Sequence, residues 1–398
     1  ELYGASVVLG SATPSLEAYY RAGRGEYRLF QLTKRLTGGE LPTVYTVDLR
    51  QELQEGNRSI FSRKLQELMT DRLNKGQQTI LFLNRRGYAG FVSCRSCGEV
   101  MKCPHCDVSL SEHKGGRLIC HYCGYTQPMP KLCPKCGSKY ILGFKAGTQQ
   151  IEEKLKELYP GVRTLRMDAD TTRTKDSYEK ILSSFANGEA DVLIGTQMIV
   201  KGHDFPKVTL VGILAADLSL NASDYRAGER TFQLLTQAVG RAGRGALPGE
   251  AVIQTYQPDH YAITCAAAQD YESFYQEEIL YRELSGYPPV AHMLAVQIYG
   301  KEEENVKQLA LRLTDVVKSN MDFLSGKQKE QSNKKIQVLG PAPANISKIN
   351  DIYRYVFYVK HAEYDVLVEV KDRLEETLRQ WQPRQMSIQF DFDPVSVL

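Results

Sequence analysis

Eight of the nine cysteines in this chain of 398 residues are arranged as four Cys-x-x-Cys pairs within one short segment. The pairs are Cys94/Cys97, Cys103/Cys106, Cys120/Cys123 and Cys133/Cys136. Two residues between two cysteines form a tight knuckle that directs both thiolates at one ion, and a tetrahedral zinc site needs two such knuckles. A redox-active Cys-x-x-Cys motif stands alone on a strand-to-helix turn, so four pairs this close together predict two zinc ions.

The sequence leaves the pairing of the four knuckles open. Consecutive pairing joins the first knuckle to the second across five residues, a short span in which to turn the chain around one ion. We favour nested pairing, in which the first and fourth knuckles hold an outer ion and the second and third hold an inner one. Sites with four protein ligands leave no position for water, so we expect structural ions. Three histidines are expected at the surface or behind the ligands: His105, His113 and His121.

The cysteine segment is also basic. Between Ser93 and Lys145, eight Lys or Arg residues stand against three acidic residues, a surplus of five where the whole chain has +3. This charge suits a polyanion such as DNA, and it equally suits a solvated surface. The candidate phosphate contacts are Lys131, Lys135 and Lys139. Three tyrosines either stack on bases or pack on the small core: Tyr122, Tyr125 and Tyr140.

The remaining composition indicates a globular protein without a membrane segment. A hydrophobic content of 42% is enough to give each of two or three domains a core. Apolar runs such as 208–216 are far shorter than a bilayer span. The first residues show no basic stretch before their apolar run, so we expect no secretory signal. The ninth cysteine, Cys265, lies in an apolar stretch and is expected to pack in a core.

Buried strands alternate with helices around the cysteine segment. Strands are expected at 7–9, 79–83, 191–194, 208–214 and 251–255, and helices at 149–158, 177–186 and 231–239. This alternation predicts a parallel sheet with helices on both faces. In such sheets the chemistry lies past the carboxyl ends of the strands, so we expect the polar residues that follow these elements to gather at that edge.

Three of the polar runs resemble helicase motifs. The run from Gly10 to Ser15 (Gly-Ser-Ala-Thr-Pro-Ser) resembles motif III of superfamily 2 helicases. The runs 195–206 and 237–244 resemble motifs V and VI. The eight-cysteine insertion after residues 84–87, together with Asp-Tyr-Arg-Ala-Gly-Glu-Arg at 224–230, is similar to the family of primosomal protein N′, the replication-restart helicase PriA. The resemblance runs from residue 1 to the C-terminus.

The resemblance implies a role for each matching residue. Arg241 and Arg244 correspond to arginine fingers that stabilise charge on a transferred phosphoryl group, with Gln237 orienting nearby groups. An alternative for two arginines after a helix is a cap that interacts with the helix dipole. Gly202 and Asp204 would approach the nucleotide. Thr196 would hold a DNA phosphate. Ser11 and Thr13 would link the nucleotide state to lobe movement.

The resemblance also implies the organisation of the chain. The chain contains no Gly-x-x-x-x-Gly-Lys-Ser/Thr sequence, and no Asp-Glu-x-His type tetrapeptide precedes Gly10, whereas the family carries both in its first motor lobe. The chain is therefore expected to be a C-terminal portion that does not hydrolyse ATP alone. We expect the tail of lobe 1 at 1–25, an α/β RecA-like lobe 2 at 26–92 and 141–283, the zinc-binding insertion at 93–140, and a C-terminal DNA-binding domain at 284–398.

The function implied for the whole protein is that of an ATP-dependent 3′-to-5′ DNA helicase of the cytoplasm. It would recognise stalled or branched replication forks and restart replication by primosome assembly. ATP and Mg²⁺ would join the two structural zinc ions as cofactors. The implied partners are forked and single-stranded DNA, single-strand-binding protein and primosome or helicase-loading proteins, with no membrane. The alternative is a zinc-stapled protein-interaction module of the replication machinery, which would not need Arg241 and Arg244.

The pattern changes after residue 289. Strands are expected at 292–299, 336–339, 353–359 and 386–392, with helices at 303–319 and 363–381. This β-α-β-β-α-β order predicts an α+β, ferredoxin-like domain. The polar run 326–335 is expected to be a mobile loop. The corresponding family domain binds branched DNA, which the basic residues Lys334, Lys335 and Lys348 permit.

Overall fold

A computed structural model describes most of the chain. It covers residues 4–32, 41–83, 92–105, 108–113, 116–121, 123–142, 147–168, 171–172, 175–200, 205–221, 224–245, 247–319 and 335–395. The expected loop at 326–335 lies outside these residues except for Lys335. Within the described residues, no helix combines the length and the apolar character needed to cross a membrane.

The larger sheet has six parallel strands in the order β1-β11-β10-β2-β9-β8. They are β1 (Thr43–Asp48), β2 (Gln78–Phe82), β8 (Thr164–Met167), β9 (Val192–Gly195), β10 (Val208–Ile213) and β11 (Glu250–Thr255). Every residue of the central strands β2, β9 and β10 is buried, because helices cover both faces. The four strands expected near residues 79, 191, 208 and 251 are thereby confirmed.

Two groups of helices make this a three-layer structure. α3 (Arg63–Asn74) and α4 (Thr148–Leu158) pack on one face through residues such as Leu65 and Leu155. α5 (Lys175–Ala186), α7 (Ala227–Val239), α8 (Tyr261–Ala268) and α9 (Tyr271–Ser285) contribute to the core on the other face, which includes Phe185 and Phe232. The remaining short helices of this part are α2 (Leu49–Gln54), η1 (Gln197–Val200) and α6 (Asp217–Leu220). Cys265 is half-buried and packs against this core.

The expected strand at 7–9 is wrong. Val7, Val8 and Leu9 are 80%, 91% and 70% exposed and have no regular structure. An apolar run forms a strand only beside another strand that accepts its hydrogen bonds, and no described strand pairs with it. The chain enters α1 (Leu16–Gly23) at Ser15, whose side chain accepts a hydrogen bond from the Ala18 backbone N–H.

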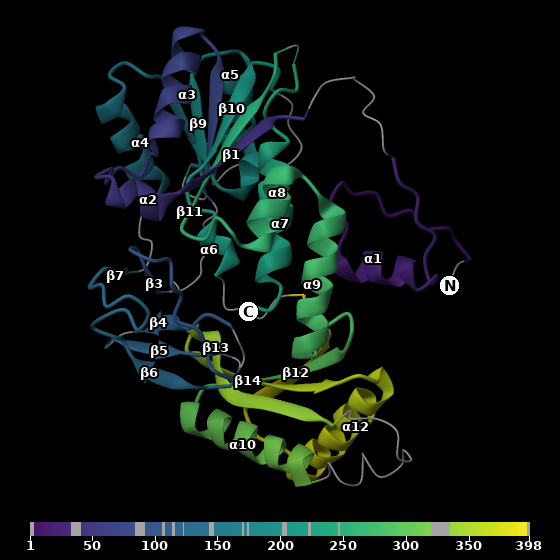
Figure 1. Ribbon diagram of the computed structural model, residues 1–398. Helices are drawn as coiled ribbons and strands as arrows, with labels where there is room; N and C mark the ends of the chain where they lie inside the picture. Colours follow the sequence, from purple (N-terminus) through teal and green to yellow (C-terminus); the bar gives the residue numbers. More distant parts are fainter. Residues whose placement is uncertain are drawn as a thin grey trace.

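The C-terminal region is the predicted ferredoxin-like α+β fold. Its antiparallel sheet has the order β13-β14-β12-β15. The elements are β12 (His292–Gly300), α10 (Glu303–Ser319), β13 (Gln337–Ile349), β14 (Ile352–His361), α12 (Tyr364–Trp381) and β15 (Met386–Phe392). α10 and α12 cover one face through a core that includes Val296 and Phe357 (Figure 1). β13 is longer than expected because it continues through irregular pairing to a tight turn at Asn350–Asp351.

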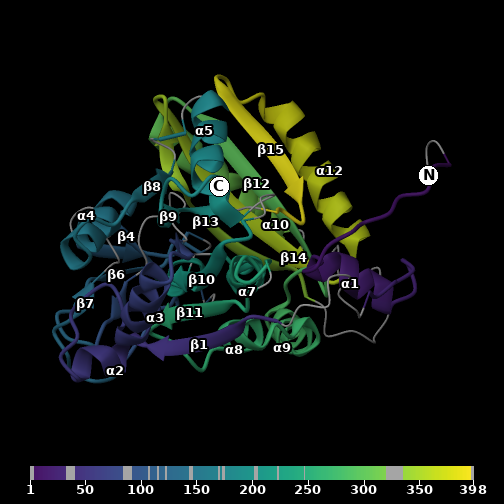
Figure 2. The same cartoon turned by 90° about the horizontal axis from the view of Figure 1, so that it is seen from above.

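The cysteine-rich segment forms a small module between the two sheets. Its strands are β3 (Ser93–Cys94), β4 (Ser111–His113), β5 (Arg117–Ile119), β6 (Thr126–Pro128) and β7 (Ile141–Leu142). β3 and β7 pair, so the chain enters and leaves the module at one place. The module lies against the face of the C-terminal sheet that α10 and α12 leave free, and it shares a core with Met293, Val356 and Tyr358 (Figure 1). Figure 2 shows the two sheets and the module from above.

Candidate functional site

The four cysteine knuckles share one backbone hydrogen bond. In each of them the first cysteine donates its N–H to the carbonyl five residues on, as from Cys94 to Glu99 and from Cys133 to Ser138, both at 2.8 Å. In three of them the glycine after the second cysteine donates back to the first cysteine's carbonyl. These glycines have φ values of 78°, 78° and 70°, in the left-handed region that a side chain disfavours: Gly98, Gly124 and Gly137.

The thiols meet in two groups, and the grouping is the nested one. Cys94, Cys97, Cys133 and Cys136 lie with their sulfurs within 4.8 Å of one another, and so do Cys103, Cys120 and Cys123. Cys106 lies outside the described residues.

The sulfur spacings fit zinc and exclude disulfides. The Cys94–Cys136 and Cys97–Cys133 sulfurs are 3.6 Å apart, and the Cys103–Cys123 sulfurs are 3.5 Å apart. Four thiolates around one zinc at about 2.3 Å lie about 3.8 Å from each other, whereas a disulfide is about 2 Å long. The two clusters therefore have the donor set and the spacing of structural zinc sites.

The cysteines of the outer cluster have pKa values that are shifted in opposite directions. Burial raises the pKa of Cys94, but the backbone N–H groups of Cys97 and Ser96 outweigh this effect and bring its pKa down to about 7. The neighbouring Cys97 has its pKa raised to about 12 by burial and by the adjacent sulfurs. A divalent cation resolves this conflict, because it lets several close thiolates coexist.

The histidines of the module contact one another, an aromatic ring and the C-terminal sheet. His121 is 1% exposed, and its Nδ1 lies 3.0 Å from the backbone oxygen of Pro343 on β13. Its Nε2 lies 3.0 Å from Nε2 of His113. His105 packs edge-on against Tyr125. His121 thus fixes the inner cluster to the C-terminal sheet.

The outer cluster rests on the carboxyl edge of the parallel sheet. Gly98 is so close to the carbonyl oxygen of Tyr256, just past β11, that a Cβ at this position would overlap it. The guanidinium of Arg95 stacks over the Tyr256 ring at 4.8 Å, and Arg50 donates to the Cys97 carbonyl at 3.4 Å. The module is therefore fixed to both sheets.

The ends of the V-like and VI-like motifs meet at the start of β10. The Gly243 N–H donates to the carbonyl of Val208 at 3.0 Å, and a Cβ on Gly245 would overlap the Pro206 carbonyl. Arg244 is exposed, with its Nε bonded to the Gly240 carbonyl at 2.9 Å. Gly202 and Asp204 lie outside the described residues. Phe205 and Pro206 follow them in the chain, and the close approach of Pro206 to Gly245 places this part of the chain next to Arg244.

The expectation that the VI-like motif lies at the carboxyl edge is wrong. α7 is a crossover helix that leaves the carboxyl end of β10 and returns the chain to the start of β11. Gln237, Arg241 and Arg244, at and beyond its C-terminus, therefore lie at the amino edge of the sheet. Thr196 does lie at the carboxyl edge, where its N–H approaches the Met167 carbonyl at 3.3 Å.

The carboxyl edge beside Thr196 holds residues that no motif indicated. The Asp168 carboxylate accepts hydrogen bonds from the hydroxyl of Thr148 at 2.5 Å and from the N–H of Thr171 at 3.0 Å. Thr148 is the first residue of α4, whose N-terminus therefore lies at this edge. The signal was available in the sequence, because Asp168 is the first polar residue after the apolar end of β8.

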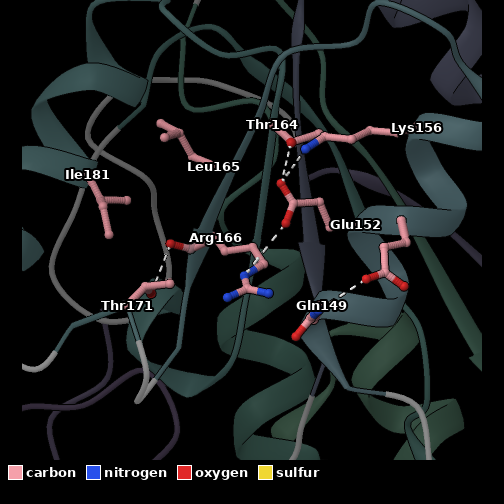
Figure 3. A pocket seen from close by; sticks show the side chains of 9 residues that line it. Gln149, Glu152, Lys156, Thr164, Leu165, Arg166, Thr171 and Ile181 are labelled. Atoms are coloured by element: carbon pink, nitrogen blue, oxygen red, sulfur yellow. Dashed lines mark hydrogen bonds and ion pairs between the residues drawn. The ribbon is translucent and has the colours of Figure 1, made fainter.

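A pocket beside α4 and β8 does not have the character of a nucleotide site. It has a volume of about 670 Å³ and lies along the free edge of β8 (Figure 3). Its charged groups satisfy one another: Glu152 pairs with Lys156 at 2.8 Å and with Arg166 at 3.7 Å. It offers no unbalanced positive charge for a triphosphate, and none of the motif residues lines it.

Residues 224–230 form the centre of a buried ionic cluster. Glu229 accepts a hydrogen bond from the Leu16 backbone N–H at 2.9 Å and pairs with Arg282 at 3.2 Å. Arg282 is fully buried and pairs with Glu278 at 2.7 Å. Burial raises the pKa of Glu229, and Arg282 opposes that shift. The cluster joins α1, α7 and α9.

The III-like segment leads into α1, which contacts this cluster, and not towards Arg241 and Arg244. Thr13 is buried and its N–H donates to the Ser11 hydroxyl at 3.1 Å, directly before α1. Arg226 pairs with Glu17 of α1 at the N-terminal end of α7. Since α7 has 13 residues, this end lies about 18 Å from the end that carries the arginines. The structure does not bring Ser11 and Thr13 together with Arg241 and Arg244.

Three family models match consecutive parts of the chain. The helicase conserved C-terminal domain matches residues 132–246. The PriA DNA helicase Cys-rich region domain matches residues 103–128, over the inner cysteine cluster. The primosomal protein N C-terminal domain matches residues 283–395. Together with the two cysteine clusters, this order decides the family. The chain belongs to the PriA family.

Relatives of known name agree with the PriA assignment. The replication restart protein PriA of Bacillus subtilis is 44% identical over 400 residues, which is 100% of this chain and 48% of that protein. The PriA of Synechocystis sp. is 41% identical over 406 residues, covering 100% of this chain and 47% of that protein. The chain spans about half the length of the curated PriA relatives it matches.

Among solved structures, S. cerevisiae Dbp5 bound to RNA and ADP BeF3 is 11% identical, with a TM-score of 0.33, and covers 69% of this chain and 54% of that one. A likeness this loose carries no argument about the PriA site.

Proposed function

We propose that this chain is the second motor lobe, zinc module and C-terminal domain of an ATP-dependent 3′-to-5′ DNA helicase. The whole protein recognises stalled or branched replication forks and restarts replication by primosome assembly. The observation that carries the proposal is the helicase conserved C-terminal domain match over residues 132–246, whose last residues are the Gly-Arg-Ala-Gly-Arg segment next to the start of β10.

In this proposal, ATP and Mg²⁺ bind between this lobe and a first lobe. Arg241 and Arg244 face the γ-phosphate, Gln237 orients nearby groups, and Gly202 and Asp204 approach the nucleotide from the neighbouring segment. Ser11 and Thr13 transmit movement between the lobes through α1 and the cluster around Glu229. Thr196, at the opposite edge of the sheet, holds a DNA phosphate through its hydroxyl, since its N–H already approaches the Met167 carbonyl. Nucleotide and DNA thus contact opposite edges of one rigid sheet.

The zinc ions have a structural role in this proposal. Two ions, held by the outer and inner clusters with Cys106 as the inner fourth ligand, would keep the module in place between the sheets. The partners proposed for the whole protein are forked and single-stranded DNA, single-strand-binding protein and primosome or helicase-loading proteins. Residues 284–398 would supply contacts to branched DNA.

The test uses the full-length protein that contains this chain. We expect Arg241→Ala and Arg244→Ala each to lower DNA-stimulated ATP turnover by roughly 10³-fold or more, because the charge of the transition state loses its partner. The affinity for single-stranded DNA stays close to wild type, since neither side chain contacts DNA. Arg163→Ala is the matched control: its exposed side chain pairs with Asp191 at the far end of the same sheet.

Turnover that is unchanged in both arginine variants would remove the motor assignment. The second candidate, a zinc-stapled interaction module, would then be favoured, because such a module needs the cysteines and not the arginines. The isolated 398-residue chain provides a further check: it should show no steady DNA-stimulated ATPase, since its sequence has no phosphate-binding Gly-x-x-x-x-Gly-Lys.

A further inference from the structure

The fourth cysteine knuckle exposes apolar side chains that the module does not use. Tyr140 is 61% exposed and Leu132 is 51% exposed, although both neighbour buried residues, Ile141 and Cys133. The hydrogen bond from the Cys133 N–H to the Ser138 carbonyl brings the two arms of the knuckle side by side, so Leu132 and Tyr140 lie at its base. We call residues 131–140 the outer knuckle.

The backbone that presents Tyr140 is held in place. Its carbonyl accepts a hydrogen bond from the Arg95 N–H at 2.8 Å, and its N–H donates to the Ser138 hydroxyl at 3.1 Å. The Ser138 hydroxyl also lies 2.8 Å from that of Ser96 on the first knuckle. The next residue pairs with Cys94 in the β3–β7 ladder. An exposed ring on a fixed backbone loses little entropy when a flat partner stacks on it.

The charge of the outer knuckle has one sign. It contains Lys131, Lys135 and Lys139 and no acidic residue. Lys135 pairs with Glu99 at 3.3 Å. Lys131 and Lys139 are exposed and form no ion pair with any residue that the structure describes. Two uncompensated cations beside an exposed aromatic ring match a chain that carries both phosphates and bases.

The other described tyrosine of the module does not have this character. Tyr125 is half-buried, its hydroxyl donates to Gln127 at 3.2 Å, and its ring packs on His105 and the core shared with the C-terminal sheet. Tyr122 lies outside the described residues. The sequence left open whether these tyrosines pack on the core or are available to stack on bases. In the structure, Tyr125 packs on the core, whereas Tyr140 is exposed to solvent.

We propose that the outer knuckle is a subsite for single-stranded DNA, in which a base stacks on the ring of Tyr140 while the phosphates on either side pass Lys131 and Lys139. The subsite rests on the proposed function, because it takes the polyanion to be the single strand that the helicase handles. The subsite would bind DNA without sequence preference, since every base has a face that stacks and the lysines would contact only phosphates.

The experiment measures binding of the zinc-loaded chain to a fluorescein-labelled oligothymidylate by anisotropy, at several salt concentrations. Tyr140→Ala should weaken binding roughly fivefold to a hundredfold with an unchanged salt dependence, because stacking carries no charge. Tyr140→Phe should restore wild-type binding. Lys131→Ala and Lys139→Ala should each reduce the log–log salt slope by about 0.7, whereas Lys154→Ala, on α4, should leave it unchanged.

An oligonucleotide with abasic sites isolates the stacking. It should bind the wild-type chain more weakly than the intact oligonucleotide, and Tyr140→Ala should bind the two equally. Zinc content is measured for every variant, and Tyr140→Ser serves if Tyr140→Ala loses its metal.

The failures are distinguishable. If the wild-type chain and the full-length protein bind no single-stranded DNA, the proposed function fails. If the wild-type chain binds but Tyr140→Ala binds equally well, or still distinguishes abasic from intact DNA, the subsite is overturned while the proposed function stands. The exposed outer knuckle is then a contact for a protein partner.

Discussion

At the scale of single residues, Arg282 is the largest of the fully buried side chains that the structure describes. It is fully buried between Glu229 and Glu278, and it donates to the Pro288 carbonyl at 2.7 Å. The two carboxylates carry more negative charge than the one guanidinium can balance. Arg226, at 4.0 Å from Glu229, partly compensates for the excess. Removing one member of a buried ion pair costs more than the pair contributes, because the remaining charge loses its partner.

We therefore predict that Arg282→Met destabilises the chain by about 3–5 kcal/mol in urea unfolding at pH 8. The cost should be smaller at pH 5. Burial already raises the pKa of Glu229, and losing the cation raises it further, so the native state binds protons more tightly than the unfolded state. Stability of the variant then falls as pH rises. Arg379→Met, at an 81% exposed position, is the control and should change little; a pH-independent cost for Arg282→Met would contradict this account.

At the scale of elements, the cysteine knuckles share one backbone hydrogen bond but differ in what they contact. Gly98 and Gly137 occupy the same position in two knuckles of the outer cluster, with φ values of 78° and 70°. A Cβ on Gly98 would overlap the Tyr256 carbonyl, whereas a Cβ on Gly137 would meet nothing within 4 Å. Comparing the same substitution at the two glycines therefore separates the stability lost to backbone strain from the stability lost when the module is displaced.

Gly137→Ala should cost about 1–2 kcal/mol, the strain of a left-handed residue with a side chain. Gly98→Ala should cost clearly more, because it must also move the knuckle away from β11. Denaturant unfolding of both zinc-loaded variants measures this difference, and hydrogen exchange at residues 255–257 should increase only in Gly98→Ala. Equal costs with equal exchange would show that the contact with Tyr256 contributes nothing.

The sequence was sufficient for elements whose pattern is local. β2, β9, β10 and β11 are short apolar runs, and the knuckles follow from the cysteine spacing, so both could be predicted. β1 was missed because it is an edge strand with no buried residue, and its pattern is only partly apolar. The strand at 7–9 was predicted wrongly because apolar residues do not reveal whether a neighbouring strand exists. The position of Arg241 at the amino edge could not be predicted, because the order of the motifs along the chain does not show at which edge of the sheet each motif lies.

At the scale of the whole molecule, the zinc module contacts both of the larger sheets. Its outer cluster meets the carboxyl edge of the parallel sheet through Gly98 and Arg95, and its inner cluster meets β13 through His121. α9 supplies a second connection, since Lys360 of β14 donates to its last residue, Ser285, at 2.8 Å. We therefore expect both metal clusters to contribute to the relative position of the two sheets.

We predict two zinc ions per chain by elemental analysis, and one in each of Cys133→Ser and Cys120→Ser. The two variants should loosen different contacts, because the clusters face different sheets. Cys133→Ser should increase hydrogen exchange at residues 255–257, and Cys120→Ser at residues 338–344. Wild-type protein treated with a chelator should show both changes. If the two variants expose the same peptides, the clusters do not act on separate sheets.

The pairing of β3 with β7 has a consequence for the order in which the chain folds. Residues 93 and 142 meet, so the module between them is a closed loop that is complete once its last strand has been made. β2 precedes the module in the chain, and its described partners, β9 and β10, are synthesised after the module. The partner of β1, β11, is also synthesised after the module. Closing the module early shortens the effective distance between β2 and those partners, which lowers the entropy lost when they pair. We therefore expect metal binding to precede assembly of the parallel sheet during synthesis, and we expect a shortage of zinc to slow the pairing of the strands of that sheet.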